Sequence, residues 1–94
     1  MNEITVDELD GSGRPVVDVR EQWEWDEGHV PGAIHIPLAE VVERFSEIPD
    51  EAAIICKAGG RSARAATYLE SQGLSVVNVA GGTDAWIAAG KPVD

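Results

Sequence analysis

The chain has 94 residues, 44% of them hydrophobic, and a formal net charge of −10 from 7 Lys and Arg against 17 Asp and Glu. This length predicts one domain over residues 1–94 with a modest core, and the acidic balance disfavours nucleic acids and anionic membranes as partners. A single cysteine cannot form an internal disulfide, and no apolar stretch reaches the length of a membrane span, so we expect a cytoplasmic protein.

Short apolar runs alternate along the chain with segments of helical periodicity. The runs predict five strands, at residues 4–6, 15–19, 34–36, 52–55 and 76–79. The remaining segments predict helices at residues 21–27 and 38–48, from Ser62 toward Gly73, and around Trp86. This alternation is typical of βα units around a largely parallel sheet.

The only cysteine, Cys56, stands between a predicted strand and a predicted helix. A loop at such a junction directs successive backbone N–H groups at one point, and the helix N-terminus adds partial positive charge there. Both effects favour a thiolate, and Lys57 and Arg61 would reinforce them. We therefore expect a nucleophilic cysteine in a loop that attracts small anions, a local exception on an acidic protein.

The other loop residues fit this interpretation. Gly59 and Gly60 allow the loop to curl its amides inward, and Arg61 can clamp oxyanions. Ser62 has two equally supported roles, a helix N-cap or a direct contact with the site.

Other chemistries have weaker support. The chain lacks the Gly-x-x-x-x-Gly-Lys-Ser/Thr pattern of nucleotide-binding loops. One cysteine and the two histidines, His29 and His35, have no recognised zinc-ligand spacing, so we expect no metal and no organic cofactor. A structural role is favoured for both histidines. Trp23 and Trp25 cannot share one helix face, so one is expected to pack and the other to be partly exposed.

Four segments together resemble the rhodanese-like family. The loop Cys-Lys-Ala-Gly-Gly-Arg-Ser at residues 56–62 is similar to the family's Cys-x-x-Gly-x-Arg-Ser/Thr active-site loop. Val-Asp-Val-Arg at 17–20, Gly-His-Val-Pro-Gly-Ala-Ile-His-Ile-Pro at 28–37 and Gly-Gly-Thr-Asp-Ala-Trp at 81–86 follow in the family's order. The visible departure is His35, where the family often carries Asn.

The resemblance implies a doubly wound α/β fold with a mostly parallel five-stranded sheet and helices on both faces. It implies that Cys56 takes a sulfane sulfur from a small anionic donor such as thiosulfate and passes it to a thiol, a protein sulfur acceptor or cyanide. The implied cradle for the persulfide is the backbone of Lys57, Ala58, Gly59, Gly60, Arg61 and Ser62. Asp18 and Arg20 match the family's Asp-x-Arg strand end, where bracing of the loop is favoured over contact with substrate.

Two other functions stay open beside sulfur transfer. Related phosphatases and arsenate reductases carry a cysteine loop one residue longer, so the shorter spacing from Cys56 to Arg61 favours a sulfurtransferase over those enzymes. A non-catalytic or redox-sensing binding module is the third hypothesis, in which Cys56 is only oxidised.

Overall fold

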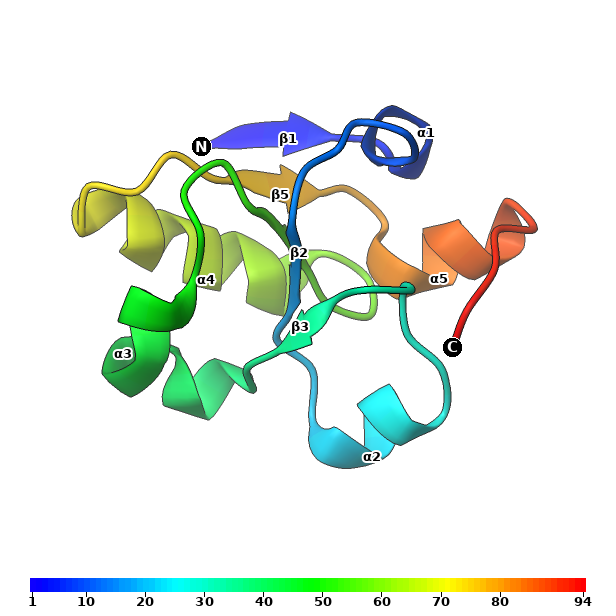
Figure 1. Ribbon diagram of the computed structural model, residues 1–94, viewed down its shortest axis with the longest axis horizontal. Coiled ribbons are helices and arrows are strands. Elements are labelled where there is room, and N and C mark those ends of the chain that lie inside the picture. Colours follow the sequence, from blue (N-terminus) through cyan, green and yellow to red (C-terminus); the bar gives the residue numbers. More distant parts are fainter.

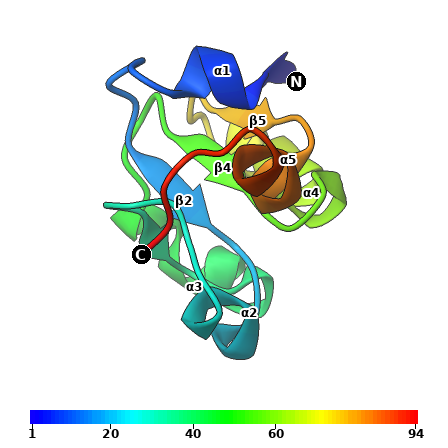
Figure 2. The same cartoon turned by 90° about the vertical axis from the view of Figure 1, so that its right-hand side faces the viewer.

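The computed structural model describes residues 1–94 and contains one five-stranded sheet. The strand order is β1-β5-β4-β2-β3, and every neighbouring pair is parallel. The strands are β1 (Asn2–Ile4), β2 (Val16–Asp18), β3 (Ile34–His35), β4 (Ala53–Ile55) and β5 (Val77–Val79). The helices are α1 (Val6–Leu9), α2 (Gln22–Asp26), α3 (Val41–Arg44), α4 (Gly60–Ser71) and α5 (Gly82–Ala88). Both views place α1 and α2 at opposite ends of the molecule (Figure 1, Figure 2).

Side chains of the central strands alternate between two hydrophobic cores. Val17 and Ile54 belong to one core with residues of α3 and α4, and Val16 and Ile55 belong to the other with residues of α1 and α5. This is the two-residue period of a strand that is buried on both faces, as parallel sheets require. The α/β fold predicted from the sequence, with helices on both faces of the sheet, is therefore confirmed.

The first strand begins earlier than predicted. It spans Asn2–Ile4 rather than residues 4–6, because Thr5 is the N-cap of α1. The Thr5 hydroxyl accepts from the Glu8 amide at 3.1 Å, and the Glu8 carboxylate accepts from the Thr5 amide at 2.9 Å. This capping box outweighs the strand propensity of the β-branched residues.

The helix predicted at residues 38–48 is interrupted. A short α3 is flanked by 3-10 turns at Leu38–Glu40 and Phe45–Glu47. The Leu38 amide donates to the Val19 carbonyl at 3.0 Å, which ties the first turn to the end of β2. Short 3-10 turns commonly complete such tethered segments. The C-terminus predicted for α4 is confirmed, since Gly73 adopts a φ of +89° directly after the helix.

The sheet places Cys56 at the carboxyl end of its middle strand. Cys56 directly follows β4, whose register pairs Ile55 with Asp18 of β2 and Ile54 with Asn78 of β5. In open parallel sheets this edge is where ligands bind. None of the helices combines the length and hydrophobicity that crossing a lipid bilayer requires.

Candidate active site

The loop between β4 and α4 is short and glycine-dependent. Gly59 is the N-cap of α4 with a φ of +112°, a backbone conformation that other residues rarely adopt. The helix therefore begins at Gly60, earlier than predicted, and the N-cap role considered for Ser62 is wrong. Ser62 instead lies fully buried in the first turn of α4.

The Cys56 sulfur is held inside this loop. Its Sγ accepts a hydrogen bond from the Gly59 amide at 3.1 Å and lies 3.3 Å from the Ser62 hydroxyl. Burial raises the pKa of the Cys56 thiol, but hydrogen bonds from the Ser62 hydroxyl and from the amides of Ser62, Gly59 and Ala58 outweigh burial and lower it. The lowered pKa favours the nucleophilic thiolate.

The two cations of the loop, Lys57 and Arg61, are paired with carboxylates. The expectation that they make the loop a basic region on an acidic protein is therefore wrong. Arg61 bonds through Nη1 and Nη2 to the two carboxylate oxygens of Glu24, at 2.6 and 2.9 Å. Lys57 Nζ lies 2.8 Å from Asp84 Oδ2. Neither pairing could be predicted, because 37 and 27 residues separate the partners. An anion at this loop therefore meets inward amides more than unpaired positive charge.

Glu24 is a site residue that the sequence did not reveal. Its carboxylate is almost fully buried on α2, and its hydrogen bonds to Arg61 lower its pKa from 4.5 to about 2. A lowered carboxyl pKa stabilises the fold above pH 4.5, and this stabilisation is lost as the pH falls toward 2.

Replacing Glu24 with Gln is expected to make the unfolding free energy depend less on pH below pH 6. Between pH 6 and pH 3 the unsubstituted protein should lose about 1 to 2 kcal/mol more unfolding free energy than the variant, after allowance for the part-exposed Arg61 partner. Denaturant titrations at both pH values measure this difference. Glu27→Gln removes the same charge from an exposed side chain without an ion pair and is the matched control. If Glu24→Gln and the unsubstituted protein lost equal unfolding free energy between pH 6 and pH 3, the lowered pKa of Glu24 would be contradicted.

Asp18 and Arg20 form a buried pair beside the loop. Arg20 bonds to both Asp18 oxygens at 2.9 to 3.0 Å and to the Gly28 carbonyl at 2.8 Å. Neither side chain hydrogen bonds to residues 56–62. The pair braces the connection between β2 and β3, which carries Glu24, and Glu24 in turn binds Arg61 of the cysteine loop.

The aromatic residues divide as expected. Trp25 stacks on His29 with ring centroids 3.5 Å apart and also stacks on His35, while Trp23 is 64% exposed. His29 Nδ1 lies 3.0 Å from the Trp25 carbonyl and His35 Nε2 lies 2.8 Å from the Arg20 carbonyl. Neither histidine bonds to Cys56, which fits structural roles for both.

The start of α5 closes the other side of the loop. The Thr83 amide donates to the Cys56 carbonyl at 2.8 Å, and the Asp84 amide donates to the Lys57 carbonyl at 3.0 Å. Gly82, with a φ of +58°, sits so close that a Cβ there would overlap both carbonyl oxygens. The double glycine at 81–82 belongs to one of the four segments that resemble the family, but its contact with the cysteine loop was not predicted from the sequence.

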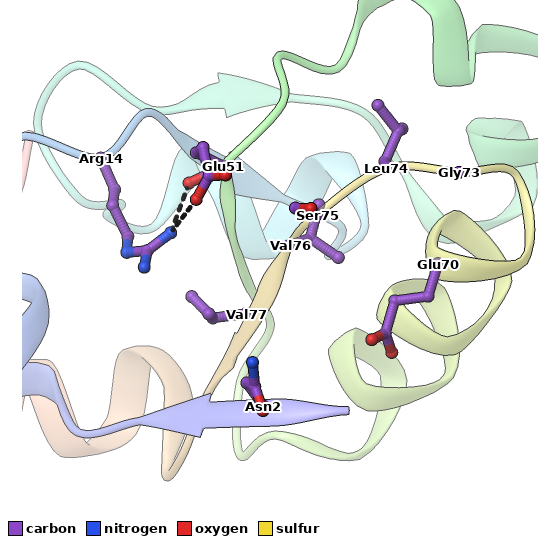
Figure 3. Close-up of a pocket in the computed structure, with 9 residues that line it drawn as sticks. All are labelled: Asn2, Arg14, Glu51, Glu70, Gly73, Leu74, Ser75, Val76 and Val77. Carbon is purple, nitrogen blue, oxygen red and sulfur yellow. Dashed lines mark hydrogen bonds and ion pairs between the residues drawn. The ribbon is translucent and has the colours of Figure 1, made fainter.

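Two cavities indent the surface. The smaller, of about 130 Å³, adjoins the loop and is lined by Lys57, by the exposed Trp23 and Ile87, and by Thr83, whose buried hydroxyl has no hydrogen-bond partner. The larger, of about 300 Å³, lies at the amino ends of the strands, away from Cys56, where Arg14 pairs with Glu51 (Figure 3). We therefore associate only the smaller cavity with the candidate site.

Comparison with known proteins identifies relatives of this chain. A family model described as a rhodanese-like domain matches residues 3–89. A sulfurtransferase of Allochromatium vinosum is 37% identical over 81 residues, which are 83% of this chain and 76% of that protein. YrkF of Bacillus subtilis, provisionally named a sulfur carrier protein, is 45% identical over 74 residues, 76% of this chain but only 40% of its own length.

A solved structure extends the agreement to the fold. The crystal structure of a rhodanese-related protein from Thermoplasma volcanium superposes with a TM-score of 0.93 at 35% identity, covering 100% of this chain and 98% of that one.

Proposed function

Because the chain belongs to the rhodanese-like domain family, we propose that it is a sulfurtransferase that carries one sulfur atom as a persulfide on Cys56. The observation that carries the proposal is the Cys56 Sγ, held by the Gly59 amide at 3.1 Å in a loop that lowers the thiol pKa. Relatives named as sulfurtransferase and as sulfur carrier support the same class of reaction.

In the first proposed step, the Cys56 thiolate attacks the outer sulfur of thiosulfate or a similar sulfane donor. A sulfur–sulfur bond forms at Cys56, the sulfur–sulfur bond of thiosulfate breaks, and sulfite leaves with the bonding electron pair. The negative charge moves to the outer persulfide sulfur. The amides of residues 57–62 are the proposed cradle for that charge, since dipoles fixed before the reaction stabilise charge without reorganising.

In the second step, an acceptor nucleophile removes the outer sulfur. Cyanide gives thiocyanate and a thiol gives a new persulfide, and in both cases Cys56 leaves as the thiolate. We propose that acceptors approach through the cavity that Lys57 and Thr83 line beside the cysteine loop. We place the reaction in the cytoplasm, because the lone cysteine must remain reduced to accept sulfur.

The proposal predicts thiocyanate formation from thiosulfate and cyanide by a ping-pong mechanism. Initial rates at several fixed cyanide concentrations should give parallel double-reciprocal lines against thiosulfate, because sulfite leaves before the acceptor binds. A chromogenic aryl phosphate is the comparison substrate. Phosphate release with no thiocyanate would overturn the proposal in favour of a phosphatase.

A further inference from the structure

Asn78 is a buried polar residue in the middle of an apolar strand. It lies on β5 between Val77 and Val79 and is fully buried. A buried amide needs hydrogen-bond partners on both its nitrogen and its oxygen. Asn78 finds them in β1, in the cysteine loop and in α4, so its side chain links the edge of the sheet to the candidate active site.

The partners fix the orientation of the amide. Asn78 Nδ2 donates to Glu3 Oε2 at 3.0 Å and to the Gly59 carbonyl at 3.3 Å. Both partners are acceptors, so the nitrogen must face them and Oδ1 must face Ser62. The Ser62 hydroxyl lies 2.5 Å from Asn78 Oδ1. Because an amide oxygen only accepts, the Ser62 proton points toward Asn78.

Ser62 thus has one proton and two acceptors. Its hydroxyl lies 2.5 Å from Asn78 Oδ1 and 3.3 Å from Cys56 Sγ. Donation to a Cys56 thiolate requires the proton to turn from oxygen to sulfur, which leaves the buried Asn78 oxygen without a donor. Leaving a buried acceptor unsatisfied is costly, so the two acceptors compete.

We propose that Asn78 is a positioning residue for sulfur transfer. Its amide oxygen competes with the Cys56 thiolate for the single Ser62 proton, and this competition preserves the nucleophilicity of the sulfur. A thiolate becomes a weaker nucleophile as it becomes a weaker base. The loop amides already lower the basicity of the Cys56 thiolate. Once the persulfide forms, charge moves to the outer sulfur and the Ser62 proton returns to Asn78. Only the hydroxyl rotates in this exchange, and no proton leaves Ser62.

Other charged groups surround Cys56, but ion pairs hold them. Arg61 pairs with Glu24 of α2, Lys57 with Asp84 of α5, and Arg20 with Asp18 at the end of β2, while Glu3 of β1 accepts from Asn78. His35 lies on β3, which β2 separates from the strand of Cys56. Over the pH range in which the thiol ionises, Ser62 is therefore the adjustable donor to the sulfur.

The pH dependence of Cys56 alkylation by iodoacetamide tests the proposal. In Asn78→Val the freed Ser62 proton should move the midpoint to lower pH by about 0.7 pH unit, the shift expected from one neutral hydrogen bond. Ser62→Ala should move the midpoint to higher pH. In the Ser62→Ala background, Asn78→Val should have no further effect, because there is no proton left to release.

A purely structural role for Asn78 predicts a different result. Loss of the bond to the Gly59 carbonyl would displace the Gly59 amide from the sulfur and raise the midpoint, with or without Ser62. That outcome, or an unchanged midpoint in Asn78→Val, overturns the proposal. The role of Asn78 in sulfur transfer rests on the proposed function. Because alkylation of Cys56 does not require sulfur transfer, the competition for the Ser62 proton and the proposed function can fail separately.

NMR of the unsubstituted protein gives a second test that does not depend on a variant folding. The ¹³Cγ resonance of Asn78 should titrate with the same midpoint as Cys56 alkylation, because Oδ1 loses its donor when the thiolate forms. A resonance that stays constant across the Cys56 midpoint overturns the proposal.

Discussion

Replacing Cys56 with serine is expected to lower thiocyanate formation from thiosulfate and cyanide at least about a thousandfold. A serine hydroxyl is not ionised near neutral pH and forms no persulfide, so the first step has no nucleophile. The protein has no second cysteine to take its place. Steady-state thiocyanate release by the variant and the unsubstituted protein measures the loss.

The same variant separates chemistry from folding. Serine is smaller than cysteine and its hydroxyl can still accept from the Gly59 amide, so the unfolding free energy should change by about 1 kcal/mol. A folded Cys56→Ser variant that still forms thiocyanate at the original rate would contradict the role of Cys56. If a variant without transfer activity still bound a partner, that binding would be a separate property of the domain.

Gly82→Ala is expected to cost about 3 kcal/mol of unfolding free energy and to reduce sulfur transfer about a hundredfold. The methyl group would overlap the carbonyl oxygens of Cys56 and Lys57, neither of which can move without shifting the loop. The positive φ of Gly82 adds the ordinary strain of a left-handed residue. Denaturant unfolding and the thiocyanate assay measure the two effects.

Gly90→Ala is the matched control for this substitution. Gly90 also has a positive φ, of +77°, but a Cβ there would meet no atom within 4 Å. The control should cost about 1 kcal/mol, from backbone strain alone, and leave sulfur transfer unchanged. If Gly82→Ala were as stable and as active as Gly90→Ala, contact between α5 and the loop would have no part in forming the site.

The features predicted correctly from the sequence are those that local patterns determine. The buried run before Cys56 and the glycine after α4 act within a few residues, so the strand, the loop and the end of the helix could be placed. Parallel pairing then follows from the alternation of strands and helices, whereas the strand order that makes β4 the middle strand comes from the structure.

The features that were missed depend on contacts between distant segments. Glu24 had no sequence signal as the partner of Arg61, since a glutamate beside two tryptophans is equally compatible with an exposed helix. The capping box at Thr5 was readable, but the β-branched residues around it were given more weight. Asn78 offered a signal that was not used: a polar residue inside a run of valines, which must find partners when buried.

The charges around the cysteine loop differ most from what the sequence predicts. Lys57 and Arg61 were expected to form a basic exception on an acidic chain, yet each has a carboxylate within 2.9 Å. Folding brings Glu24 and Asp84, which are distant from the loop in sequence, to Arg61 and Lys57. In the proposed reaction, stabilisation of the persulfide therefore rests on the backbone of residues 57–62, with the ion pairs holding that backbone in place.

Intact-protein mass spectrometry after incubation with thiosulfate tests whether Cys56 carries a persulfide. We expect the unsubstituted protein to gain about 32 Da, one sulfur atom. The added mass should map to Cys56, disappear after treatment with cyanide, and be absent from Cys56→Ser. A correctly folded protein that never gains this mass from thiosulfate or any other sulfane donor would show that Cys56 is not a sulfur carrier.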